Sequence, residues 1–573
     1  MGNPLLYIPP LLRRRRQLRR ADVDIPTDVP STDAVFLVLR RMRAPLLTLI
    51  GVFSVSVVGL ALAPGVDADG LAHRLTVFDA FYVMSYTATT IGFGEIPYAF
   101  TIQQRLWVTF SIYATVLAWA YAIGTLLALL QDAAFRSAIA TQRFRRRVRR
   151  IDGPFHVVAG FGQAGRQVAL GLDDLRRRAV VIDRLEARID ALATQPVFNE
   201  MPGVEADVRN PAVLGLAGLG HRHCEGVLAL TDDDDVNLSV VQSVHLLRPE
   251  VPVIARCTDR TVQERMAAFG AQAVINPLDR FGVYLVAALQ RPATLQLVSW
   301  LMSPPGTRLP ERSLPAPSGR WVVCAEGQFR DEVGRDLAAA GYEVSFADPA
   351  ELAPDATGAL GFVAGTARDS TNLALAAHVR QTSPDVRLCL REESSTAAPL
   401  LAAFAPETVF VPTDLVAREC LARIVTPLTW AFIEHALGQG DGWSEAVLDD
   451  LRERCGDGAP AMSRLSIAPE TAPAVVRWLG RGELTVGDLL RHPDDRSETA
   501  SAVVLSLARD DAVAFVPDAD TRLQPGDELL VATPARSHWG LRDVLYNDAA
   551  VEYVATGRRI PATWVWRVLT RHR

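Results

Sequence analysis

The stretch Thr87-Ala-Thr-Thr-Ile-Gly-Phe-Gly-Glu95 lies between two long apolar segments, 44–63 and 106–130, and neither segment contains a charged residue. Each is long enough to cross a hydrocarbon core of about 30 Å as a helix. Glycine alternates with larger residues at Ile91-Gly-Phe-Gly94, and glycine reaches backbone angles that other residues avoid. The alternation can therefore aim successive carbonyls toward one axis. A ring of such carbonyls can replace the hydration shell of an ion.

The residues before this stretch, 77–89, predict a short helix between the two spans. We expect four side chains to pack it in place, namely Phe78, Phe81, Tyr82 and Met84. The alternative is a glycine-rich extracellular turn between two unrelated membrane helices. Such a turn does not need the preceding helix, so a re-entrant segment is favoured.

Read in this order, the segment resembles the potassium-channel signature Thr-Val-Gly-Tyr-Gly-Asp. The resemblance implies a pore helix over 77–89, whose C-terminal dipole end favours cations. It also implies a selectivity filter, with potassium bound at the first four of its five residues, Thr90, Ile91, Gly92, Phe93 and Gly94. Phe93 replaces the usual Tyr and Glu95 the usual Asp, and both departures bear on the strictness of selectivity.

Composition limits the other possibilities. A chain of 573 residues predicts three or four domains. All 59 basic residues are Arg, which excludes Schiff-base lysine chemistry and a Walker-type phosphate loop. The six cysteines show no Cys-x-x-Cys pair, so we expect reduced, buried thiols in the cytosol.

Arginine blocks at 13–16, 40–43 and 143–150 flank the spans. The positive-inside rule then predicts a multi-pass protein of the cell membrane with both termini cytoplasmic. The blocks either bind anionic membrane lipid or only set the topology. In the second span, Gly124 is either a gating hinge or a point of close helix approach.

From residue 155 the pattern becomes soluble α/β. A buried strand, 155–159, leads into Gly160-Phe-Gly-Gln-Ala-Gly165, a helix to about 178, and a strand ending at Asp183. This order matches the dinucleotide fingerprint, in which glycines admit phosphates and the acid accepts from ribose. The predicted nucleotide-binding residues are Gly160, Phe161, Gly162, Gln163, Gly165, Asp183, Arg184 and Asp207. Asp183 favours NAD by repelling a 2′-phosphate, whereas Arg184 leaves NADP open.

The α/β alternation continues to about residue 303 and resembles the RCK domain, which regulates potassium conductance in prokaryotic channels. Residues 232–235 are four aspartates. They either bind calcium or cap the following helix, and they lack an EF-hand loop pattern.

A second copy follows a proline-rich linker. His156-Val-Val-Ala corresponds to Trp321-Val-Val-Cys, and Asp183 to Asp348, at an offset of 165 residues. Later the offset is 135, so the second copy has lost 30 residues around Asp207.

The glycine positions of the first copy become Ala325, Gly327 and Arg330 in the second. We expect Arg330 to obstruct the close packing of helix on strand, and the second copy to hold a dinucleotide poorly.

The predicted fold is a membrane α-helical pore domain (helix, pore helix, filter, helix), followed by two Rossmann-like α/β RCK domains and a small α+β lobe. The expected segments are an N-terminal arm 1–43, a pore domain 44–131, a linker 132–153, RCK domains at 154–303 and 318–440, a lobe 455–540 and a tail 541–573.

One filter segment per chain cannot enclose an ion, so the resemblance implies a homotetramer. The expected function is a ligand-gated potassium channel, not an enzyme, regulated by an adenine nucleotide and without a nucleic-acid partner. The alternatives are a membrane-anchored NAD-dependent oxidoreductase and a component of a potassium-uptake transporter. The first leaves the filter unexplained. The second would carry four pore repeats in one chain.

Overall fold

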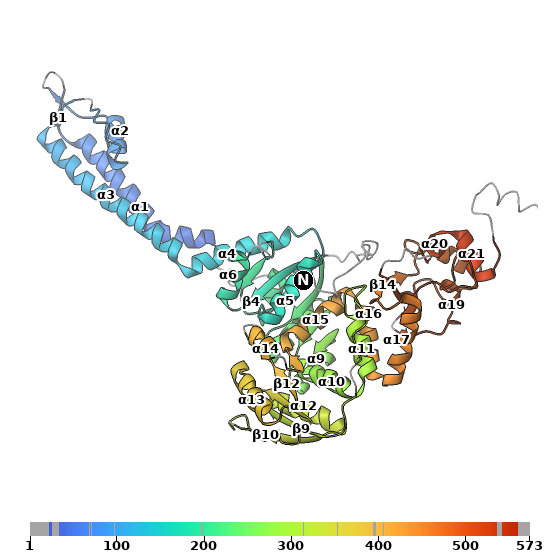
Figure 1. The fold of residues 1–573 in the computed structure, drawn as a ribbon. Helices are drawn as coiled ribbons and strands as arrows, with labels where there is room; N and C mark the ends of the chain where they lie inside the picture. The colour runs from blue at the N-terminus through green and yellow to red at the C-terminus, as the bar shows by residue number, and fades with distance from the viewer. Residues whose placement is uncertain are drawn as a thin grey trace, which may run out of the picture. The chain divides into compact units, whose positions relative to one another are not determined.

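The computed structural model divides into two compact units, one from 34 to 150 and one from 151 to 559 together with 22–25 (Figure 1). The described residues are 22–25 and 34–559, except 68, 70, 97, 196, 197, 199, 313, 314, 352, 394–396, 405, 511 and 536–540. The arginine block 13–16 and the end of the tail, 560–573, lie outside them. Each unit has its own hydrophobic core.

The first unit contains four helices and a short antiparallel hairpin among its described residues. They are α1 (Ala34–Leu62), β1 (Gly65–Val66), β2 (Ala72–His73), α2 (Val77–Ala88), α3 (Ile102–Gln131) and α4 (Ala133–Arg149). Two stretches are long and apolar enough to cross a membrane, Arg40–Leu62 and Ile102–Gln131. Both predicted spans are therefore helical. The expected linker, 132–153, is mostly the helix α4.

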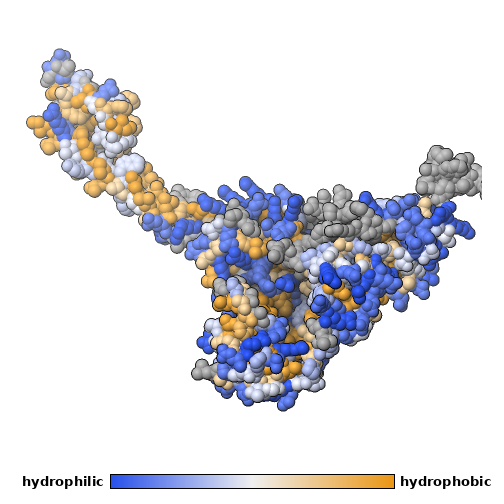
Figure 2. Space-filling view, in the orientation of Figure 1, coloured by the Kyte–Doolittle hydropathy of each residue, from blue (hydrophilic) through white to orange (hydrophobic). Residues whose placement is uncertain are grey.

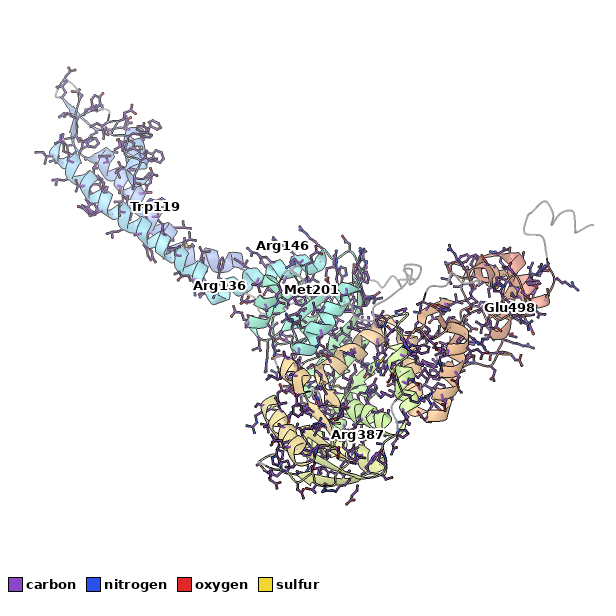
Figure 3. All side chains as sticks on the ribbon, in the orientation of Figure 1. Trp119, Arg136, Arg146, Met201, Arg387 and Glu498 are labelled. Carbon is purple, nitrogen blue, oxygen red and sulfur yellow. The ribbon has the colours of Figure 1, made fainter. Side chains whose placement is uncertain are left out.

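A glycine of α1 makes room for a tryptophan of α3. A Cβ at Gly59 would lie 2.0 Å from the Trp107 ring, whose Nε1 donates to the Ser56 carbonyl oxygen at 3.0 Å. The outer faces of the two helices carry many exposed apolar side chains, Trp119 among them (Figures 2 and 3). These faces are available for lipid or for other subunits.

The predicted packing of α2 is only partly right. Met84 is fully buried, together with Ala80 and Val83. Phe78 and Phe81 are 74% and 50% exposed in the single chain, and Tyr82 is also exposed. At 3.6 residues per turn, these three aromatic side chains fall on the face opposite the buried one.

The first α/β domain has a parallel six-stranded sheet in the order β5-β4-β3-β6-β7-β8. Its elements are β3 (Phe155–Ala159), α5 (Gln163–Asp174), β4 (Arg178–Asp183), α6 (Glu186–Thr194), β5 (Gly203–Glu205), α7 (Pro211–Leu216), β6 (Cys224–Ala229), α8 (Asp234–Leu247), β7 (Val253–Arg256), α9 (Arg260–Ala268), β8 (Ala273–Ile275), α10 (Pro277–Gln290) and α11 (Pro292–Leu301). The strand order reverses between β3 and β6, and ligands of doubly wound sheets bind at this point.

The second α/β domain has five parallel strands in the order β10-β9-β11-β12-β13. Its elements are β9 (Arg320–Ala325), α12 (Gly327–Ala339), β10 (Glu343–Ala347), β11 (Gly361–Gly365), α13 (Asp369–Thr382), β12 (Arg387–Arg391), α14 (Ala398–Phe404), β13 (Thr408–Phe410), α15 (Pro412–Val425) and α16 (Pro427–Gly438). Among its described residues, the sheet has no counterpart of β5. This agrees with the 30 residues missing from the second copy.

The two α/β domains exchange helices. Helix α15 of the second domain packs its apolar face on α5 of the first, with Leu421 against Gly171. Conversely, α10 of the first domain packs on α12 of the second through Phe281 and Phe329. Each fully buried Leu or Phe contributes roughly 1.5–3 kcal/mol, so the two domains form one cooperative body.

A small antiparallel lobe follows α17 (Asp441–Cys455), with the strand order β14-β17-β15-β16. Its elements are β14 (Ala461–Ser466), α18 (Pro473–Leu479), α19 (Val486–Leu489), β15 (Val503–Arg509), β16 (Ala512–Phe515), β17 (Glu528–Thr533), α20 (Leu541–Tyr546) and α21 (Asp548–Thr556). The expected boundary at residue 540 is wrong, because Leu541, Val544 and Val551 are buried in the core of the lobe. The first part of the predicted tail therefore belongs to this lobe.

All six cysteines are free and buried, as predicted. Burial raises the pKa of Cys257 to about 12, so its thiol stays protonated at neutral pH. The segment 22–25 lies on the first α/β domain, where the Val23 amide donates to the Gly220 carbonyl oxygen at 2.9 Å.

Candidate functional sites

The sign of the backbone angle φ alternates along the predicted filter. Thr90, Gly92 and Gly94 have φ values of 60°, 63° and 73°, whereas Ile91 and Phe93 between them do not have a positive φ. Alternation of hand turns successive N–H groups to one side of the chain. The corresponding carbonyls then point to the other side.

One carbonyl oxygen accepts hydrogen bonds from two of these N–H groups. The amides of Ile91 and Gly92 both donate to the Tyr86 carbonyl oxygen, at 3.0 and 3.1 Å. The turn is thus held against the C-terminal end of α2. Carbonyl oxygens presented in this way can coordinate a desolvated cation when several chains surround it.

Two hydroxyl groups of α2 support the outer end of the filter. Tyr86 donates to the Glu95 carbonyl oxygen at 2.8 Å, and Tyr82 to a Glu95 carboxylate oxygen at 3.0 Å. The Tyr86 ring also packs edge-on against Phe93, with ring centroids 6.3 Å apart. Sequence reasoning noted that Phe93 lacks the hydroxyl of the usual Tyr. It missed that Tyr86 supplies a hydroxyl to the same segment. The aromatic residues of α2 were the available signal.

Gly124 lies within α3, and a Cβ there would meet no atom within 4 Å. In the single chain it does not make a close helix contact, whereas Gly59 does.

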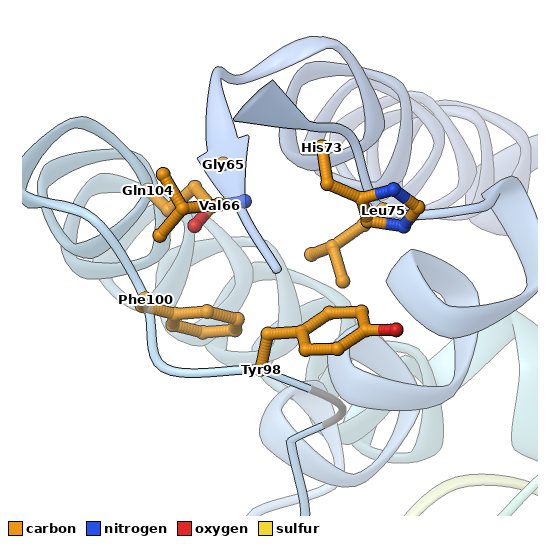
Figure 4. Close-up of a pocket in the computed structure, with 7 residues that line it drawn as sticks. All are labelled: Gly65, Val66, His73, Leu75, Tyr98, Phe100 and Gln104. Carbon is orange, nitrogen blue, oxygen red and sulfur yellow. The ribbon is translucent and has the colours of Figure 1, made fainter. Parts of the chain in front are cut away.

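A small hollow lies between the hairpin β1–β2 and the chain leading into α3 (Figure 4). It is lined by Gly65, Val66, His73, Leu75, Tyr98, Phe100 and Gln104. The Gln104 side chain accepts from the Thr101 amide at 3.1 Å as part of the N-terminal cap of α3. The hollow therefore fits a structural role in the loop.

The predicted nucleotide site lies at the carboxyl ends of β3, β4 and β6. Gly160 has φ +95°, and a Cβ there would lie 2.8 Å from the Thr231 backbone nitrogen. A Cβ at Gly165 would lie 2.0 Å from the Gly160 carbonyl oxygen, so this glycine allows α5 to pack closely on β3. Both positions therefore require glycine.

The N-terminus of α5 is open. Gly162 is its N-cap and forms no side-chain cap hydrogen bond, and only Arg188 comes within 4 Å of a Cβ placed there. Uncapped amides and the helix dipole favour an anion such as a phosphate. Gln163, in the first turn, accepts a hydrogen bond from the Thr413 hydroxyl of the second domain at 3.3 Å.

Asp183 is placed differently from the expectation. Its side chain is 2% exposed. Its oxygens accept from the amides of Phe161 and Leu185 at 2.6 and 2.9 Å, and from Arg188 at 3.1 Å. It therefore holds the glycine loop in position, and its burial leaves little of the carboxylate accessible to a ribose hydroxyl.

The neighbouring edge of the sheet carries positive charge. Asp207 is about half exposed, and Arg209 binds both of its oxygens at 2.8–3.1 Å. The Arg209 contact, aided by the charge of Arg184, lowers the pKa of Asp207. Arg184, Arg188 and Arg209 thus bring guanidinium groups to the strand ends where an anionic ligand would lie.

The corresponding turn of the second domain differs in charge. Glu326, the counterpart of Phe161, is the N-cap of α12 and is exposed. Its carboxylate occupies the helix end that favours anions. Asp348 is exposed and accepts from the Ala350 amide at 2.9 Å.

The expected role of Arg330 is wrong. Arg330 is exposed, and its guanidinium lies 4.4 Å from the centroid of the Phe346 ring instead of between helix and strand. The turn follows another path, because Gly327 carries the positive φ, +57°, and Phe329 fills the space beside Gly365. The second domain thus disfavours a phosphate by charge and by the shape of its turn.

Two of the four aspartates at 232–235 have structural contacts. Asp233 caps α8 by accepting from two amides of its first turn. One oxygen of Asp234 accepts from the Thr258 hydroxyl and amide and from the Asp259 amide, at 2.8–2.9 Å. Within the described part of the chain there is no group of three His, Cys, Asp or Glu side chains placed to hold a metal ion. The helix-cap interpretation fits these contacts.

Comparison with known proteins identifies the first α/β domain. Residues 156–277 match the TrkA-N domain, from within β3 to the start of α10. The chain therefore carries a TrkA-N domain, in the region where the sequence resembles an RCK domain.

Two relatives match about two fifths of the chain. An uncharacterized protein of Methanothermus fervidus is 24% identical over 247 residues, which are 43% of this chain and 38% of that protein. Potassium channel protein 1 of Methanocaldococcus jannaschii is 22% identical over 227 residues, which are 39% of this chain and 66% of that protein. The chain thus spans less than two thirds of either relative.

Among solved structures, a GsuK channel bound to NAD is 15% identical, with 88% of this chain and 97% of that chain covered and a TM-score of 0.41. The domain match and the named Methanocaldococcus relative confirm the resemblance to a potassium channel with an RCK domain.

Proposed function

We propose that the chain is the subunit of a homotetrameric, ligand-gated potassium channel of the cell membrane. The observation that carries the proposal is the alternating backbone from Thr90 to Gly94, between two helices of spanning length. Two of its amides, those of Ile91 and Gly92, donate to the Tyr86 carbonyl oxygen. Potassium moves passively through this filter, and no catalytic residue is needed.

The ion is held by the Thr90 hydroxyl and by the carbonyls of Thr90, Ile91, Gly92 and Phe93. One chain supplies one such row, so four chains related by a closed rotation are required to surround the ion. The exposed apolar faces of α1 and α3 support contacts with neighbouring subunits and with lipid. The arginine blocks flanking the spans favour cytoplasmic termini.

The regulatory ligand is an adenine nucleotide, NAD in the first instance, bound by the first α/β domain. Support comes from the TrkA-N match, the open N-terminus of α5 and the guanidinium groups of Arg184, Arg188 and Arg209. Gly162 and Gly165 admit the phosphates. The α/β domains of the four subunits form a ring on the cytoplasmic side, and nucleotide binding favours one conformation of this ring. α3 bends at Gly124 to transmit the change to the pore.

Flux from liposomes tests the proposal. Reconstituted protein should release potassium well above sodium, should be blocked by barium, and should respond to added NAD. Gly92→Ala is the matched control. It strains a position with φ +63° but meets no atom within 4 Å, so the assembly should persist while selective flux is lost. Equal potassium and sodium flux in the unaltered protein would contradict the channel assignment.

A further inference from the structure

A carboxylate lies in the packed seam between the two α/β domains. Asp336 of α12 faces Gly282 of α10, where a Cβ would lie 1.6 Å from the Asp336 Oδ2 atom. Among the described residues this buried oxygen has no hydrogen-bond partner. A buried polar atom without a partner carries the full cost of its lost hydration.

The charges around Asp336 do not compensate it. Asp279 of α10 and Glu332 of α12 are nearby carboxylates. Arg260 of α9 pairs with both of them, at 3.2 and 3.1 Å, and Arg335 of α12 pairs with Glu332 at 2.6 Å. Both arginines are thus engaged by other acids. Burial, reinforced by Asp279 and Glu332, raises the pKa of Asp336 to about 6.

The internal repeat provides a comparison within the same chain. The counterpart of Asp336, 165 residues earlier, is Gly171 on α5. A Cβ at Gly171 would meet only the side chain of Leu421 on α15, so this equivalent seam is apolar at that point.

The polar residues at the edges of the two seams also differ, and the α10–α12 seam again has more carboxylates. At the α5–α15 seam the Gln167 amide donates to Asp414, a neutral donor meeting a single carboxylate. At the α10–α12 seam the corresponding residues are Glu332 and Asp279, two carboxylates that need Arg260 between them. The two related contacts therefore differ in their number of carboxylates, and only the α10–α12 contact has one at the position of Asp336.

We propose that the α10–α12 seam is a proton-sensitive joint between the two α/β domains. Uptake of one proton by Asp336 removes a partly buried charge whose Oδ2 atom has no hydrogen-bond partner among the residues that the structure describes, and tightens the contact of α10 with α12. Loss of that proton loosens it. The α5–α15 seam, which holds the nucleotide-binding helix, does not respond in this way.

The direction of the pH effect on stability follows from the linkage between proton binding and folding. Because the folded pKa of Asp336 lies above the ordinary value of about 3.8, the folded state binds more protons between these two values. Stability therefore falls as pH rises through this window, and the loss is complete once pH exceeds the folded pKa. Acidification from about pH 8 to pH 5 therefore restores part of this stability, and the rest returns as pH approaches about 3.8.

The test compares the full-length protein in detergent with Asp336→Asn. The variant should melt at a higher temperature than the wild type near pH 8, and the difference should shrink as pH falls below about 6 toward about 4. Asp331→Asn, an exposed position of the same helix, is the matched control and should show no such convergence. A difference that stays constant with pH, or a less stable Asp336→Asn at pH 8, overturns the proposal.

Hydrogen–deuterium exchange locates the effect and keeps the test independent of global melting. After correction for intrinsic rates, acidification should protect α10 and α12 in the wild type but not in Asp336→Asn. The α5 and α15 peptides serve as internal reference. Equal protection at both seams would show that the response belongs to the whole body and not to this joint.

Discussion

The glycine loop of the first α/β domain depends on a buried acid, and Asp183→Asn tests this dependence. The carboxylate accepts from the amides of Phe161 and Leu185 and pairs with Arg188. Asparagine has nearly the same shape but keeps only one acceptor oxygen and presents N–H donors in place of the other. One of the two backbone amides must then face a donor.

The size of the effect follows from burial. The Asp183 side chain is 2% exposed, so water cannot replace the lost acceptor, and an unsatisfied buried donor costs about 1–3 kcal/mol. The lost ion pair adds little, because the Arg188 side chain is 38% exposed. At roughly 2–4 °C per kcal/mol for a domain of this size, the melting temperature should fall by about 2–12 °C.

The repeat supplies the control. Asp348 is the counterpart in the second domain, is exposed, and accepts one local hydrogen bond from Ala350, so Asp348→Asn should change stability by no more than about 0.5 kcal/mol. Thermal unfolding of the two full-length variants, and NAD calorimetry on each, distinguish them. Only Asp183→Asn should weaken NAD binding. Equal melting temperatures for the two variants, or NAD binding lost only in Asp348→Asn, would refute the argument.

Two further substitutions test the two sites. Tyr86→Phe removes the hydroxyl that donates to the Glu95 carbonyl at 2.8 Å. Flux should persist with a lower preference for potassium over sodium. An unchanged preference would contradict the supporting role of this hydroxyl. Gly165→Ala forces a methyl to within 2.0 Å of the Gly160 carbonyl and should cost about 1–3 kcal/mol and NAD affinity. Gly162→Ala is the control, because a Cβ there has no atom closer than 3.8 Å, and it should leave stability nearly unchanged. Equal losses of stability in the two glycine variants would count against a close helix–strand contact.

Sequence reasoning located elements whose signal is local. The glycines at 92, 94, 160 and 165 stand where the backbone has positive φ or admits no Cβ, and both requirements are properties of a few adjacent residues. The repeat was also readable, because the two copies keep matching residues at fixed offsets. The spans were visible from length and composition alone.

What the sequence did not reveal depends on contacts between distant segments. The fingerprint places an acid after the second strand, but it does not say whether Asp183 faces the ligand or the loop. Arg330 occupies a glycine position, yet the turn moves and the side chain lies outside on Phe346. The apolar stripes of α10 and α15 indicate that each helix has a partner, not that the partner belongs to the other copy.

This exchange of helices connects the open N-terminus of α5 to both α/β domains. The N-terminus of α5 is the anion-binding end, Gln163 in its first turn already contacts Thr413, and its apolar face carries α15 of the second domain. A nucleotide that orders this helix end therefore acts on an element that the two domains share. The second domain, where the carboxylate of Glu326 disfavours a phosphate, can take part through this contact without a ligand of its own. Its other seam, at α10 and α12, is where a different signal, a proton, can act on the same body.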